Sequence, residues 1–112
     1  MSESDRGSTT AFDPEKFEHK YEHYFAELEQ AYSRAFDTMH AGYDSGIVHA
    51  IDQQVLAESE PLYEGNGEFR IALPEAPAEL LGEEYTDEEI ADVLKTYVEQ
   101  LERELQSVFG FR

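Results

Sequence analysis

The stretch from Asp13 to His40 constrains the fold more than any other part of this sequence. Placed on a helical wheel at about 100° per residue, its aromatic and apolar residues share one side, with three more rings at the edge: Phe17, Tyr21, Tyr24, Leu28, Ala31, Ala35 and Met39, then Phe25, Tyr32 and Phe36. Charged residues such as Glu15 and Glu22 fall on the opposite side. The pattern predicts one long amphipathic helix, about 13–41, with a broad aromatic face.

Turn and capping signals divide the rest of the chain into three further elements. Apolar residues at helical spacing predict a short helix over about 45–58, in which Leu56 is out of phase. Asn66-Gly67, the preferred pair for a tight hairpin turn, lies between two short segments and predicts a β-hairpin over about 62–73. A capping box formed by Thr86 and Glu89 begins a last helix over about 87–109.

These elements predict an α+β fold that is mainly helical. The two long helices, about 13–41 and 87–109, are expected to pack as an antiparallel pair, because their apolar faces are similar in length. The short helix and the hairpin then pack on one side of that pair. Residues 1–11 are polar and charged and are expected to form a disordered tail, which leaves 12–112 as one domain.

Composition restricts the classes of function. The chain has no cysteine, so disulfides, thiolate metal sites and cysteine nucleophiles are excluded. Its net charge of −18, from 26 acidic and 8 basic residues, repels phosphate and therefore disfavours nucleic acids and anionic membrane surfaces. The sequence has no apolar run long enough for a membrane span and no basic, apolar leader, so a cytoplasmic location is expected.

Residues 19–23 match the H-x-x-E-H pattern of a zinc hydrolase, with His19, Glu22 and His23 in the matching positions. Both histidines fall on the side of the predicted helix opposite the aromatic stripe, where a buried metal site would need a further covering layer. The sequence offers no convincing third ligand. We therefore expect two solvated histidines, no cofactor and no catalytic residue, with a small metal-dependent hydrolase as a remote alternative.

Two other features with possible chemistry have simpler explanations. The Gly65-Asn66-Gly67 segment resembles a phosphate-binding loop, but flanking glutamates and the lack of a following helix favour a hairpin turn. His40 and His49 each stand without a serine or carboxylate partner in the sequence, so neither suggests a catalytic triad.

The aromatic stripe itself permits two interpretations. Most of it is expected to form the core, while Phe17, Tyr21 and Phe25 are candidates for an interface with a protein partner or a second copy of the chain. A second hypothesis makes the acidic surface a partner or decoy for a basic protein surface. No small-molecule substrate is suggested by either hypothesis.

Three segments together resemble a family of uncharacterised, small, acidic proteins from haloarchaea, a domain of unknown function. They are Phe12-Asp13-Pro14-Glu15-Lys16-Phe17, Tyr43-Asp44-Ser45-Gly46 and Glu68-Phe69-Arg70-Ile71-Ala72-Leu73-Pro74. The resemblance covers nearly the whole chain beyond the tail and implies a haloarchaeal origin and a cytoplasmic setting. It implies no activity and transfers no functional residue.

Overall fold

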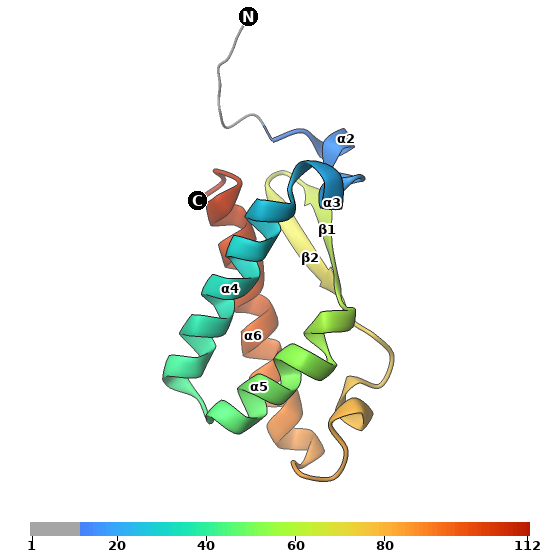
Figure 1. Ribbon diagram of the computed structural model, residues 1–112, viewed down its shortest axis with the longest axis vertical. Helices are drawn as coiled ribbons and strands as arrows, with labels where there is room; N and C mark the ends of the chain where they lie inside the picture. The colour runs from blue at the N-terminus through green and yellow to red at the C-terminus, as the bar shows by residue number, and fades with distance from the viewer. Residues whose placement is uncertain (1–11) are drawn as a thin grey trace, which may run out of the picture.

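The computed structural model describes residues 12–112, so the predicted tail over 1–11 lies outside the described residues. The fold is α+β and mainly helical, with a two-stranded antiparallel hairpin (Figure 1). In chain order the elements are α2 (Pro14–Phe17), α3 (Lys20–His23), α4 (Phe25–Gly42), α5 (Ser45–Gln54), η2 (Leu56–Glu58), β1 (Glu60–Gly65), β2 (Glu68–Ala72), η3 (Pro77–Leu81) and α6 (Asp87–Val108).

Helices α4 and α6 pack side by side and run in opposite directions (Figure 1). Their ends meet where the ring of Tyr24, just before α4, lies 5.0 Å from the ring of Phe109, just after α6. The predicted capping box is present, because Thr86 Oγ1 accepts a hydrogen bond from Glu89 N and Glu89 Oε1 accepts one from Thr86 N. The predicted last helix is therefore confirmed to within a residue.

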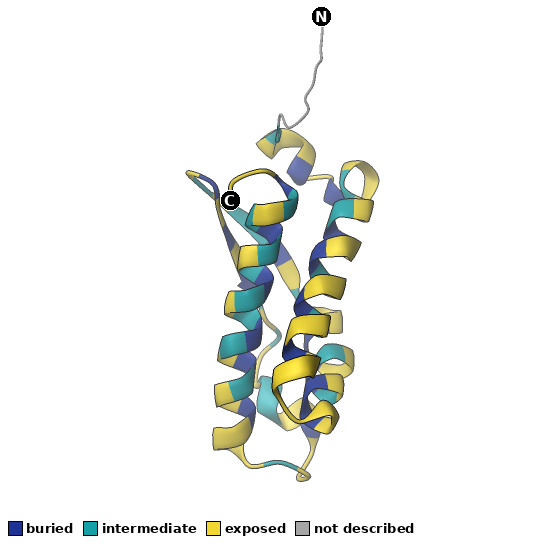
Figure 2. Cartoon of the chain, turned by 90° about the vertical axis from the view of Figure 1, so that its left-hand side faces the viewer, coloured by how far each residue is buried: buried dark blue, intermediate teal, exposed yellow. Residues whose placement is uncertain are grey.

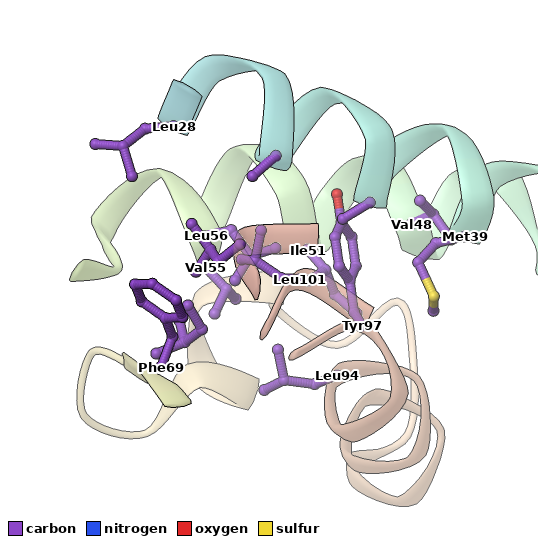
Figure 3. Packing of buried hydrophobic residues seen from close by; sticks show 14 of the residues in the cluster. Leu28, Met39, Val48, Ile51, Val55, Leu56, Phe69, Leu94, Tyr97 and Leu101 are labelled. Carbon is purple, nitrogen blue, oxygen red and sulfur yellow. The ribbon is translucent and has the colours of Figure 1, made fainter. Parts of the chain in front are cut away.

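The core lies where α4, α5, α6 and the hairpin meet (Figure 3). The residues of α4 and α6 that are buried lie on the sides of the two helices that face each other, and the exposed ones point outward (Figure 2). Helix α5 contacts both long helices, and β2 packs on α6. In α6 the apolar residues recur every three or four positions, which places them on one side of the helix. The buried residues of α6 are Ile90, Leu94, Tyr97, Leu101 and Leu105.

The prediction of one continuous first helix over 13–41 is wrong. The chain forms two helical turns, α2 and α3, before α4, and the helix breaks at His19 and again at Tyr24. Both residues leave the helical region, with φ −119° and ψ 45° at His19 and φ −130° and ψ 22° at Tyr24. Neither glycine nor proline occurs between residues 18 and 24, so no local sequence signal marks the break.

Burial of aromatic rings explains why the helix breaks there. Seven rings form an aromatic cluster at the end of the α4–α6 pair: Phe12, Phe17, Tyr24, Tyr63, Phe69, Phe109 and Phe111. The breaks allow Phe12 and Phe17 to fold across this end, and Phe17 keeps only 3% of its surface exposed. Burying one such side chain contributes about 1.5–3 kcal/mol, more than the net value of a lost backbone hydrogen bond, about 0.5–1.5 kcal/mol.

The middle of the chain follows its predicted order with one local change. The predicted helix over 45–58 ends at Gln54 and continues as the tighter helix η2, which turns the out-of-phase Leu56 into the core at 3% exposure. The hairpin is present, with positive φ at Asn66 and Gly67 as the tight turn requires. A bulge between Tyr63 and Gly65 adjusts its register.

Candidate functional site

An apolar groove lies between α4 and the segment that leads from α5 into β1. It encloses about 210 Å³ and is lined by Tyr21, Phe25, Leu28, Glu29, Tyr32, Leu56, Ala57, Ser59 and Pro61. This volume is below the range of about 300–1,000 Å³ that is typical of cofactor and drug-sized ligand sites. The groove therefore suits one or two side chains of a partner better than a cofactor.

Two exposed rings border the groove. Tyr21 keeps 60% and Phe25 57% of its surface exposed, although both lie on the stripe that supplies the core. Phe17, the third residue predicted for an interface, is buried in the aromatic cluster and does not belong to this surface. The break after Phe17 leaves Phe17 buried and Tyr21 and Phe25 exposed. A continuous helix would not predict this difference.

A buried lysine anchors α3 beside the groove. Lys20 is 5% exposed, and its Nζ lies 3.0 Å from Glu60 Oε2 on β1. The same ammonium group lies 5.2 Å from the ring centre of Phe17 and 5.5 Å from that of Tyr21, within the range of cation–π contacts. These contacts hold α3 against β1 and fix the position of Tyr21 at the edge of the groove.

The floor of the groove contains a hydrogen bond between two hydroxyl groups. Tyr32 Oη and Ser59 Oγ lie 3.0 Å apart, and Ser59 Oγ also donates to the carbonyl oxygen of Leu56. Burial raises the pKa of Tyr32 to about 12, the hydrogen bond to Ser59 lowers it, and the nearby Tyr21 and Glu60 raise it further. The hydroxyl is thus held neutral and partnered, and it acts as a structural group.

We expect a separate phenolate step from Tyr32 in a spectrophotometric titration. The difference between the wild type and a Tyr32→Phe variant should show the step near pH 12, against about 10 for a free tyrosine. Burial favours the neutral hydroxyl, so the pKa of Tyr32 is higher in the folded protein than in the unfolded chain. The resulting contribution to the free energy of unfolding is complete below about pH 10 and is lost as the pH rises through about 12. A step near pH 10 in the folded protein would show that water reaches this hydroxyl.

The histidines occupy exposed positions. His19 precedes α3 and His23 is its last residue, and both are exposed. Within residues 12–112 no group of three or more histidine, aspartate or glutamate side chains is placed to hold a metal ion. The rings of His40 and His49 each lie 5.4 Å from the ring of Phe36, the first stacked and the second edge-on. These imidazoles therefore pack locally on Phe36, and among the described residues neither is hydrogen-bonded to a serine, threonine or tyrosine hydroxyl.

Two clefts elsewhere on the surface differ from the groove in chemistry. One, of about 340 Å³, lies between α2 and β1 over the Lys20–Glu60 pair. The other, of about 320 Å³, is lined mainly by charged residues, among them Glu99, Glu102 and Arg103 of α6. Burial raises the pKa of Glu102, and a hydrogen bond with the backbone of Ile71 partly offsets this rise. Neither cleft combines an apolar lining with exposed rings, so the groove is the strongest candidate site.

Comparison with known proteins identifies the class to which the chain belongs. A family model described as "Family of unknown function (DUF5783)" matches residues 9–112, and the chain is therefore a member of that family. No curated protein and no solved structure matches it. Across residues 12–112, no helix has the length and apolar character needed to cross a membrane.

Lys20 was not predicted from the sequence to lie beside this surface. The signal that could have revealed it is its spacing, because Lys20 is three residues after Phe17 and four before Tyr24, at the margin of the apolar stripe. Lysine at such a position can bury its aliphatic stem. Its partner Glu60 is 40 residues away, and a contact at that separation depends on the tertiary fold.

Proposed function

We propose that this protein is a non-catalytic protein-interaction module that works in a salt-rich cytoplasm and binds a partner through the groove. The observation that supports the proposal best is the pair of exposed rings, Tyr21 and Phe25, at the border of an apolar groove. Tyrosine and phenylalanine are enriched at protein interfaces, and residues that dominate binding energy cluster around well-packed pockets.

The acidic composition supports the salt-rich setting. A net charge of −18 on a chain of 112 residues creates strong self-repulsion in dilute buffer. At about 1 M salt the Debye length shrinks to about 3 Å, and most of this repulsion is screened. The resemblance to small acidic haloarchaeal proteins points in the same direction.

An enzymatic alternative has less support. The H-x-x-E-H residues His19, Glu22 and His23 are exposed on α3, a single turn of helix. A catalytic zinc needs ligands held by further partners in a partly dry cavity. The groove contains Tyr32 and Ser59, which bond to each other, and within residues 12–112 neither hydroxyl is hydrogen-bonded to a histidine or a carboxylate.

The proposal is tested by affinity capture from cell extract at native salt. Phe25→Ser removes the apolar ring from the groove, and Tyr43→Ser removes a ring with 45% exposure from the connection between α4 and α5. We expect a partner that binds to the wild type and to Tyr43→Ser but is lost with Phe25→Ser, while all three proteins keep the same circular dichroism. Equal capture by all three would contradict the proposal.

A further inference from the structure

We infer that the groove binds a basic amphipathic helix of a partner protein, with an apolar side chain in the groove and arginine or lysine residues against its acidic rim. This inference rests on the proposed function and specifies its partner. Three features of the groove lead to it: the spacing of its lining residues, its size and the charge of its border.

The lining residues follow the spacing of a helix-binding surface. Phe25, Leu28 and Tyr32 succeed one another at intervals of about one helical turn on α4, and all three line the groove. Tyr21 of α3 extends this lining beyond the break at Tyr24. The groove therefore extends along α3 and α4, while Leu56 and Pro61 form its opposite wall. An amphipathic helix binds such a groove through apolar residues at matching intervals.

The size of the groove limits what enters it. A volume of about 210 Å³ accommodates a large apolar side chain or two small ones. Tyr32 and Ser59 use their hydroxyl groups on each other, so the floor offers little to a polar ligand. The ring of Phe25 is 57% exposed at the border of the groove, where a guanidinium or ammonium group would gain a cation–π contact.

The border of the groove is acidic. Glu29 lines it, and Glu22 and Glu58 are sequence neighbours of the lining residues Tyr21 and Ser59. Glu60 also follows Ser59, but its carboxylate is paired with Lys20. Each of these glutamates is exposed. The neighbouring lysine, Lys20, is buried with its charge directed at Glu60, so it presents little positive charge to a partner. A basic helix would therefore meet the carboxylate of Glu29 beside its apolar anchor.

Charge distinguishes this partner from a second copy of the chain. A second copy would bring its own −18 charge and the same acidic border to the contact. Like charges placed opposite each other at an interface oppose association and suppress wrong partners. A basic helix replaces this repulsion with attraction between groups in direct contact, whose separation is comparable with the Debye length of about 3 Å at about 1 M salt.

The test uses two synthetic helical peptides and the full-length protein. One peptide carries leucine and phenylalanine on one face and arginine on the other; the second has glutamate in place of arginine. Fluorescence anisotropy in about 2 M KCl, a strongly screened condition, measures their binding to the wild type, Phe25→Ser and Tyr43→Ser. A Glu29→Gln, Glu58→Gln double variant reports on the border charges.

We expect the arginine peptide to bind the wild type and Tyr43→Ser equally, and to bind Phe25→Ser at least about tenfold more weakly, as removal of a main anchor does. The double variant should lose affinity by a smaller factor, and the glutamate peptide should not bind. Sedimentation equilibrium of the protein alone should show a monomer.

Three results would overturn the inference. If both peptides bind equally and Phe25→Ser weakens both, the groove binds proteins but does not select basic ones, so only the partner class is wrong. A dimer that Phe25→Ser dissociates would make the second copy the occupant. Equal binding of the arginine peptide to Phe25→Ser would show attachment to the acidic coat at large; whether the proposed function then fails is decided separately by the capture experiment.

Discussion

Replacing Phe17 by alanine is expected to lower the free energy of unfolding by about 3–5 kcal/mol, the usual cost of truncating a buried phenylalanine. The ring is 3% exposed, and its centre lies within 6.2 Å of the rings of Phe12, Tyr24, Phe69 and Phe109. The same change at Phe25, which is 57% exposed, should alter stability by within about 0.5 kcal/mol, as is usual for surface positions.

Urea unfolding at constant high salt measures both variants. Both residues are phenylalanines and lie eight positions apart in the same predicted stripe. The difference between their effects on the free energy of unfolding therefore reports on the break between α2 and α4. A continuous helix would place both rings near one face and give similar losses. Comparable destabilisation by the two substitutions would contradict the broken arrangement.

Lowering the salt concentration is expected to unfold the protein at neutral pH. The net charge is −18, and ion pairs such as Lys20–Glu60 and Arg70–Glu64 offset little of it. Like charges one turn apart, such as Glu88 and Asp92 on α6, each cost about 0.2–0.5 kcal/mol when unscreened. Summed with long-range repulsion, these costs are comparable with a total stability of about 5–15 kcal/mol.

Circular dichroism during stepwise dialysis from molar to millimolar KCl follows this loss. Helical signal should fall as salt is removed and return when it is restored. Acidification to about pH 4.5, near the reference pKa of glutamate, should partly replace salt because it neutralises the same carboxylates. Helicity and melting temperature that do not respond to salt at pH 7 would contradict the salt-adapted interpretation.

Local signals were sufficient to predict most of the elements. Asp44 and Thr86 cap the helices that follow them, since their side chains accept hydrogen bonds from Ile47 N and Glu89 N. Asn66-Gly67 specifies the hairpin turn because both residues adopt positive φ there. Each of these signals lies within a few residues of the cap or turn that it determines, so it can be recognised in the sequence.

Long-range packing decided the parts that the sequence did not reveal. The break at His19 follows from contacts of Phe12 and Phe17 with Phe69 and Phe109, which are distant in the chain. Helical periodicity predicts that Phe17 and Phe25 lie on the same side of one helix. The contacts of Phe17 with distant rings decide that Phe17 is buried while Phe25 is exposed. The groove likewise requires Leu56 and Pro61 to meet α4, which no local pattern indicates.

Site-specific photo-crosslinking tests the central claim, that Tyr21 and Phe25 form a docking surface. A benzophenone amino acid is placed at position 25 or, as a control, at the exposed position 43, and the protein is irradiated in cells at native salt. We expect position 25 to give one discrete covalent adduct with a partner protein and position 43 to give none. Adducts of equal yield at both positions, or none at position 25, would contradict the claim.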